Sequence, residues 1–109
     1  MTDLIVMQIA CPEDGTATRI GAALVEERLA ACTHLLAPHE ARYRWRGALE
    51  CEGEVTLLAK TRAGLANRVA ARVRDLHPYE VPAILGSRVD FTTPDYAAWV
   101  AEQTREPGA

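Results

Sequence analysis

The sequence is poor in lysine, in aromatic side chains and in long apolar runs. Aromatic residues make up 6% of the 109 positions, and Lys60 is the one lysine beside eleven arginines. No stretch reaches the roughly 20 apolar residues that a membrane-spanning helix needs. The first ten residues, MTDLIVMQIA, have neither a basic segment nor a small-residue cleavage site. We therefore expect no membrane segment and no secretory signal.

An excess of positive charge and a disulfide pattern are also missing. The formal net charge of -3 gives no support for a nucleic-acid partner. Cys11, Cys32 and Cys51 form an odd set without a C-x-x-C pair. In a chain without an export signal this favours the reducing cytoplasm, and each cysteine is typical of a small buried residue.

Motifs for the common catalytic sites are absent as well. The chain has no G-x-S-x-G elbow, no H-E-x-x-H and no glycine-rich phosphate loop. We therefore expect a protein without catalytic activity and without an organic cofactor.

The hydrophobic periodicity predicts alternating strands and helices. Apolar runs and period-two alternation predict strands, and apolar residues three and four apart predict helices. The predicted strands are 4–10, 32–37, 42–46 and 81–89, with a turn and a further long strand within 47–60, and the predicted helices are 16–31, 63–76 and 94–104. Thr61 is expected to cap the second helix and Thr93 the third, with Pro94 in the first helical position.

This order predicts an α+β fold in one domain spanning 1–109. The arrangement β-α-β-β-α-β, with an inserted β-ribbon and a C-terminal helix, is the split β-α-β pattern of a ferredoxin-like sandwich. Helices on one face of such a sheet leave the other face uncovered, and oligomerisation commonly supplies the cover.

The segment RYRWR predicts a ribbon with two different faces. Arg42, Arg44 and Arg46 alternate with Tyr43 and Trp45. A hairpin turning about Ala48 would place these arginines opposite Glu54, Glu52 and Glu50, respectively, in a ladder of opposite charges. The two rings would then face away from the ladder, where a neighbouring subunit could cover them.

The segment LHPYEVP, residues 76–82, places His77 at the end of the second helix. A residue before proline avoids helical angles, so the helix should stop at or before His77. One interpretation is a structural imidazole that hydrogen-bonds a carbonyl and holds a rigid turn. The other is a metal ligand or a proton-handling group in a cleft between subunits.

Five blocks together resemble a known family. LAAC, YRWRG, EVTLLAKT, HPYEVP and PDYAAWV follow one another in the order typical of the CutA divalent-cation tolerance proteins. The resemblance spans nearly the whole chain. It implies a ferredoxin-like subunit, a homotrimer built by edge-strand pairing, a cytoplasmic setting and binding of divalent cations, Cu(II) in particular.

The family's metal ligands carry over only in part. His77 matches the histidine of the family's HPY motif, which is associated with copper. The cysteine of some members falls at Ile9, although Cys11 lies two positions on and points the same way along a strand. Leu76 stands where some members have a second histidine. The resemblance therefore implies His77 and Cys11 as the metal ligands of this chain.

A cleft between subunits is the second candidate site. Its walls would be Tyr43, Trp45 and Tyr79, with Glu54 and Lys60 as polar groups. The simpler alternative is that the rings only pack and that the two charged residues form an ordinary ion pair.

Three functions follow from these interpretations. The first is a non-catalytic cytoplasmic homotrimer that binds divalent cations and acts in the response to metal ions. The second is a signalling trimer, similar in architecture to the PII regulators, that binds a small anionic effector near Lys60. The third is an assembly scaffold without a ligand.

Overall fold

The computed structural model describes residues 2–106, and these form five strands and three helices. The strands are β1 (Leu4–Pro12), β2 (Cys32–Leu35), β3 (His39–Trp45), β4 (Ala48–Arg62) and β5 (Ile84–Arg88). The helices are α1 (Thr16–Glu26), α2 (Ala66–Leu76) and α3 (Pro94–Gln103), with a 3-10 turn, η1 (Ala63–Leu65), before α2.

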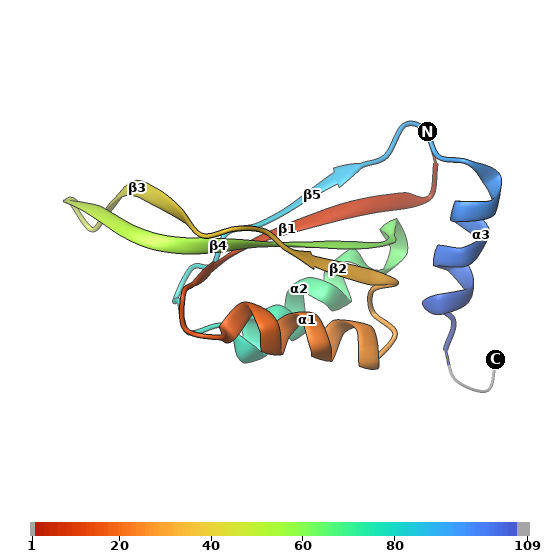
Figure 1. Ribbon diagram of the computed structural model, residues 1–109, viewed down its shortest axis with the longest axis horizontal. Coiled ribbons are helices and arrows are strands. Elements are labelled where there is room, and N and C mark those ends of the chain that lie inside the picture. The colour runs from red at the N-terminus through yellow and green to blue at the C-terminus, as the bar shows by residue number, and fades with distance from the viewer. Residues whose placement is uncertain (1, 107–109) are drawn as a thin grey trace.

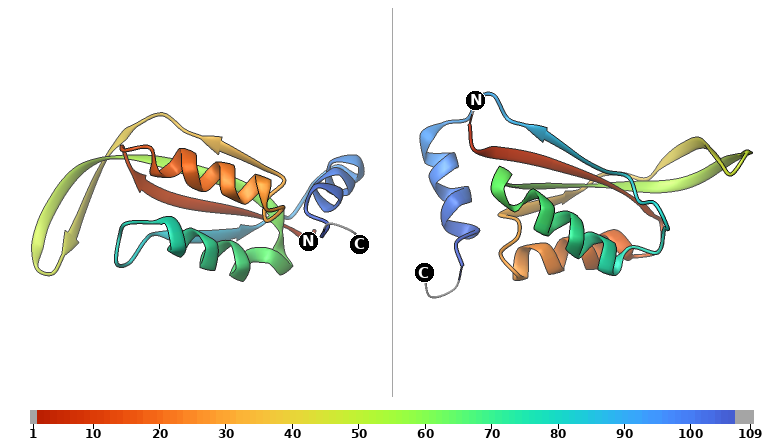
Figure 2. Two further views of the ribbon diagram at one scale, coloured as in Figure 1. Left: turned by 90° about the horizontal axis from the view of Figure 1, so that it is seen from below. Right: turned by 180° about the vertical axis from the view of Figure 1, so that it is seen from behind.

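The strands form one antiparallel sheet in the order β2-β4-β1-β5, and β3 pairs with the outer half of β4 as a hairpin. Helices α1 and α2 lie side by side on one face, while α3 stands at the end of the sheet (Figures 1 and 2). This is the predicted α+β arrangement, with the ribbon inserted before the second half and a helix added at the end. Within residues 2–106, the sheet face opposite α1 and α2 carries no helix.

The main core lies between the sheet and the two helices. Alternate residues of β1 and β4 point into it, and Ile20 and Leu24 of α1 meet Val69 and Val73 of α2 there. Ile9, Ile20, Leu24, Val69 and Val73 are completely buried. Each such side chain contributes about 1.5–3 kcal/mol through burial. The period-two and helical patterns of the sequence thus reflect one shared apolar layer.

The hairpin turns at Arg46 and Gly47, not about Ala48. Both residues have positive φ, 50° and 83°, as a two-residue hairpin turn of the primed type requires. Trp45 therefore pairs with Ala48 and Tyr43 with Glu50. The predicted charge ladder was wrong, because pattern alone placed the turn without regard to its backbone angles.

The observed register changes which side chains share a face of the hairpin. Cross-strand partners project to the same side, so Tyr43 lies on the side of Glu50 rather than away from it. Arg42 instead forms an ion pair with its neighbour Glu40, at 2.7 Å. The ribbon thus has an aromatic and acidic face and an arginine-rich face.

Helix α1 ends at Glu26, five residues earlier than predicted. Arg28 takes a left-handed conformation, with φ of 60°, and the backbone N–H groups of Leu29 and Ala30 both donate to the carbonyl of Leu24. This reversal places Leu29 and Ala30 in the core. Thr61 does not cap a helix. It is buried in β4, and its hydroxyl donates to the carbonyl of Leu29 at 2.7 Å.

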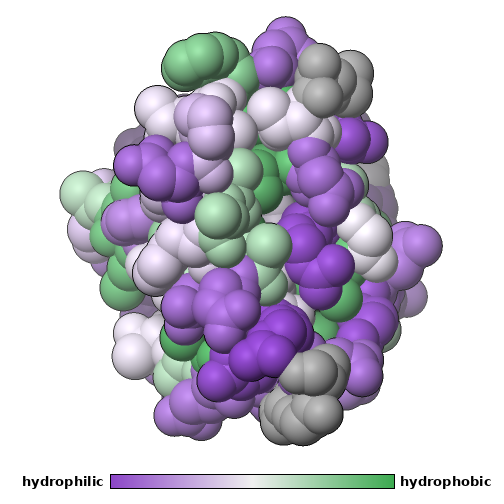
Figure 3. Space-filling model, turned by 90° about the vertical axis from the view of Figure 1, so that its right-hand side faces the viewer, coloured by the Kyte–Doolittle hydropathy of each residue, from purple (hydrophilic) through white to green (hydrophobic). Residues whose placement is uncertain are grey.

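Helix α3 is attached through its C-terminus. Arg62 of β4 donates from Nε to the Thr104 hydroxyl at 2.8 Å and from Nη2 to the Thr104 carbonyl at 3.1 Å. Val100 is completely buried, whereas Trp99 is 43% exposed. Seen from this end, the surface is mostly hydrophilic, with hydrophobic residues scattered between (Figure 3). No helix in residues 2–106 is long and apolar enough to cross a membrane.

Candidate functional site

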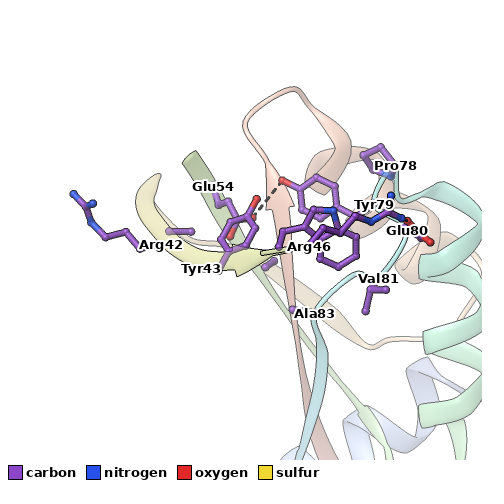
Figure 4. A pocket seen from close by; sticks show the side chains of 12 residues that line it. Arg42, Tyr43, Arg46, Glu54, Pro78, Tyr79, Glu80, Val81 and Ala83 are labelled. Atoms are coloured by element: carbon purple, nitrogen blue, oxygen red, sulfur yellow. Dashed lines mark hydrogen bonds and ion pairs between the residues drawn. The ribbon is translucent and has the colours of Figure 1, made fainter. Parts of the chain in front are cut away.

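A pocket of about 600 Å³ lies between the curved hairpin and the connector from α2 to β5. Side chains of the hairpin, such as Tyr43, face side chains of the connector, such as Tyr79, across the pocket (Figure 4). The lining residues are Ala10, Ala41, Arg42, Tyr43, Trp45, Arg46, Glu54, Pro78, Tyr79, Glu80, Val81 and Ala83. Sequence segments more than 30 residues apart thus build one site.

The connector is held in place by His77. Helix α2 ends at Leu76, and His77 is extended, with φ of -89° and ψ of 134°, as the following proline favours. The His77 Nδ1 accepts a hydrogen bond from the Tyr79 backbone N–H at 3.1 Å. The other ring nitrogen, Nε2, therefore carries the proton and donates it to the Ala10 carbonyl at 2.7 Å. The imidazole ties the connector to β1.

Tyr79 projects from this fixed connector toward Glu54 of β4. Its hydroxyl donates to Glu54 Oε2 at 3.3 Å, and its ring lies 4.8 Å from the His77 ring, centre to centre. Glu54 is only 7% exposed. A carboxylate buried to that extent depends on nearby donors to replace its hydration, and the Tyr79 hydroxyl is one such donor.

Carboxylates lie close to both phenols of the pocket. Burial and the nearby Glu54 raise the pKa of Tyr79 above its ordinary value. The pKa of Tyr43 is also raised, by desolvation and then by Glu52, Glu54 and Glu50. Both phenols therefore stay protonated near neutral pH and act as hydrogen-bond donors toward carboxylates.

The two arginines of the pocket are already paired with glutamates. Arg46, in the hairpin turn, forms an ion pair with Glu80 of the connector, and its guanidinium lies 5.3 Å from the centre of the Trp45 ring. Arg42 pairs with Glu40. The contact between Arg46 and Glu80 links the end of the hairpin to the connector and closes one side of the pocket.

His77 and Cys11, the predicted metal ligands, do not fit a metal site as they lie in the chain. Both His77 ring nitrogens are engaged in hydrogen bonds. Cys11 is completely buried in the core, and burial, with Asp14 and Glu54 nearby, raises the pKa of its thiol to about 11. Metal ligation needs a free imidazole lone pair and a thiolate. Within residues 2–106, no group of three histidine, cysteine or acidic side chains is placed to hold a metal ion.

The pocket brings together four of the five residues predicted for a cleft. Tyr43, Trp45, Glu54 and Tyr79 line it. Lys60 lies six positions along β4 from Glu54, where it pairs with Val6 of β1 and Cys32 of β2, and it is outside the described lining. Lys60 and Glu54 share one face of β4, but their charges lie far apart, because six strand residues span about 20 Å.

Sequence reasoning missed Arg46, Glu80 and Val81 as pocket residues. The dipeptide Arg46-Gly47 carried a usable signal, because glycine commonly occupies the second position of a primed hairpin turn. With the turn placed there, the hairpin faces follow. The contact from Arg46 to Glu80 has no local signal, since 34 residues separate the two.

The comparisons with known proteins agree with this fold. The sequence profile described as "CutA1 divalent ion tolerance protein" matches residues 5–103. The Pyrococcus horikoshii "Divalent-cation tolerance protein CutA" is 37% identical over 103 residues, which cover 94% of this chain and 100% of that protein. The Thermus thermophilus protein of that name is 37% identical over 99 residues, covering 91% and 96% of the two chains.

Solved structures and longer relatives extend the comparison. The crystal structure of CutA from Xylella fastidiosa matches with a TM-score of 0.91 and 35% identity, covering 95% of this chain and 100% of that chain. Protein CutA of Homo sapiens is 35% identical over 96 residues, which are 88% of this chain and 54% of that longer protein. A profile match and identities above 30% over nearly the full length place the chain in the CutA1 divalent ion tolerance protein family.

Proposed function

We propose that this chain is a homotrimeric, non-catalytic protein of the cytoplasm that binds divalent cations, copper foremost, in the response to metal ions. The observation that carries the proposal is the acidic and aromatic pocket beneath the hairpin, in a chain whose relatives are named for divalent-cation tolerance. The three cysteines are free thiols, which agrees with a reducing compartment.

Two surfaces support assembly into a trimer. One sheet face is uncovered within residues 2–106, and strands β2 and β5 are the edges of the sheet. The hairpin extends beyond α1 and α2 and leaves Trp45 39% and Leu49 76% exposed. Burial of apolar area contributes about 25 cal/mol per Å², so covering these surfaces outweighs single exposed ion pairs.

Among the groups of the pocket, the geometry best supports the oxygen atoms as ligands of a cation. Glu54 presents a mostly buried carboxylate, and the hydroxyls of Tyr43 and Tyr79 lie near it. His77 would have to release the Tyr79 amide before its Nδ1 could reach a cation. We therefore propose Glu54 as the principal ligand and neighbouring copies as the source of the others.

Calorimetric titration with Cu(II), Zn(II) and ATP tests the proposal. We expect stoichiometric binding of Cu(II), at least about tenfold weaker affinity in Glu54→Gln and little change in Glu26→Gln, which alters an exposed glutamate of α1. A copper affinity that is lost in His77→Ala but kept in Glu54→Gln would move the site to the imidazole. The absence of binding by every divalent cation would contradict the function itself.

Assembly is tested separately by light scattering at micromolar concentration. The proposal expects the mass of three chains, whereas a monomer would contradict it. The effector-binding alternative expects ATP or another anion to bind and to lose affinity in Lys60→Ala. The position of Lys60 outside the described pocket lining gives that alternative no support from this site.

A further inference from the structure

The pocket is much larger than a metal ion requires. A cavity of about 600 Å³ is of the size that small organic ligands occupy. Its walls include the rings of Tyr43, Trp45 and Tyr79 beside the apolar side chains of Pro78 and Val81. An occupant of this space would therefore need an apolar body as well as a charge.

The charge that fits is positive. Glu80 neutralises Arg46 and Glu40 neutralises Arg42, so the two cations of the lining are already compensated. Glu54 has the Tyr79 hydroxyl as its hydrogen-bond donor, at 3.3 Å, and is 93% buried by its exposed fraction of 7%. A mostly buried carboxylate on a pocket wall is stabilised in its charged form by a cation beside it.

The electrostatic surroundings of Tyr43 also favour a positively charged occupant. Glu50, Glu52 and Glu54 alternate along β4 and so share one face of the hairpin with Tyr43. Besides desolvation, it is these carboxylates that raise the pKa of Tyr43. Aromatic faces add to the attraction, because the negative face of a ring attracts an ammonium group and can also pack against an apolar body.

We propose that this pocket binds a small organic cation: a primary ammonium group attached to an apolar or aromatic body. The ammonium would lie against the Glu54 carboxylate and the Tyr79 hydroxyl, and the body against the rings of Tyr43 and Trp45. The inference rests on the pocket proposed above as the ligand site. It does not require that the pocket binds a metal ion.

Three ligands with one ring and different charges test the proposal. Benzylammonium, benzyl alcohol and benzoate are titrated into the assembled full-length protein without added metal, and binding is followed by Trp45 fluorescence in a Trp99→Phe background. Trp99 belongs to α3 and stacks on Tyr96, far along the chain from the pocket lining. We expect benzylammonium to bind at least about tenfold more tightly than benzyl alcohol, and benzoate to bind more weakly still.

Variants identify the group that selects the charge. Glu54→Gln should reduce the preference for benzylammonium over benzyl alcohol at least about tenfold, while Glu26→Gln should keep it. Tyr79→Phe removes the hydroxyl and keeps the ring, so it should weaken benzylammonium binding with a smaller effect on benzyl alcohol. If Glu54→Gln does not fold, the charge preference of the unaltered pocket and the Tyr79→Phe comparison still decide.

Equal affinities for the three ligands would overturn the inference, as would preference for benzoate. The absence of any binding would overturn it too. Copper binding by the same protein in the titration described above would leave the proposed function standing in each case. Benzylammonium binding without copper binding would support the organic-cation site and contradict the proposed copper binding.

Discussion

The imidazole of His77 donates a hydrogen bond from Nε2 to the carbonyl of Ala10, at 2.7 Å, and so joins the connector after α2 to the C-terminal part of β1. The same ring accepts the Tyr79 backbone N–H. The position of the Tyr79 side chain, and with it one wall of the pocket, depends on this pair of contacts.

His77→Ala should therefore lower the free energy of unfolding and loosen the pocket. Removing one partner leaves the Ala10 carbonyl and the Tyr79 amide without their hydrogen bonds, at a cost of about 1–3 kcal/mol. Urea denaturation measures the loss. His77→Gln, whose amide can both donate and accept, should recover part of the lost stability. A free energy of unfolding that is unchanged in His77→Ala would show that the two contacts do not stabilise the fold.

Gly47→Ala should destabilise the hairpin through the backbone alone. An added Cβ at Gly47 meets no atom within 4 Å, but the residue has φ of 83°. A side chain in this left-handed region costs about 1–2 kcal/mol. Thermal or urea unfolding measures the effect, and Gly64→Ala is the matched control.

Gly64 also has open space around a Cβ, and its φ lies outside the left-handed region. Alanine there should be neutral or stabilise by about 0.4–1 kcal/mol, because it restricts the unfolded chain. Equal effects of the two substitutions would contradict the turn at Arg46 and Gly47.

Arg62→Ala should release the C-terminal end of α3. The guanidinium makes two hydrogen bonds to Thr104, and hydrogen bonds of a charged group contribute a net of about 1.5–3 kcal/mol each. Hydrogen exchange of the α3 amides should accelerate more than that of α1. Arg68→Ala, which removes an exposed ion pair with Glu106 at 3.3 Å, should have an effect below about 1 kcal/mol and serves as the control.

The buried thiol of Cys11 predicts a loss of stability at alkaline pH. Burial, Asp14 and Glu54 raise the pKa of this thiol from 9.0 to about 11 in the folded chain. Between these values the unfolded state has released the proton and the folded state still binds it, so stability falls as pH rises. The contribution is fully present below pH 9 and is lost as pH rises toward about 11.

Urea unfolding between pH 8 and pH 11 should show this slope in the unaltered protein and a shallower one in Cys11→Ala. The tyrosines titrate in both proteins, so the difference between the two curves isolates Cys11. Parallel curves would show that folding does not raise the pKa of the Cys11 thiol.

The amino-acid sequence by itself determined the elements and their order. Periodicity within a strand or helix is a local property, so β1, α2 and the end of α2 before Pro78 followed from it directly. The position of Thr93 before α3 and the pairing of a helix layer with one sheet face followed in the same way. The exposed pair of rings in RYRWR also pointed to the hairpin as the site's outer wall.

Tertiary structure decided the register, the partners and the pocket. The hairpin turn depends on two positive φ values, which moved Tyr43 onto the acidic face and removed the expected arginine ladder. The partners of His77 and Arg46 lie 67 and 34 residues away, and only folding brings them together. A repeating pattern records which side of an element is apolar, whereas hydrogen bonds across the chain depend on where whole elements meet. For that reason the residues Tyr79 and Glu54 could be named in advance, but the contact between them could not.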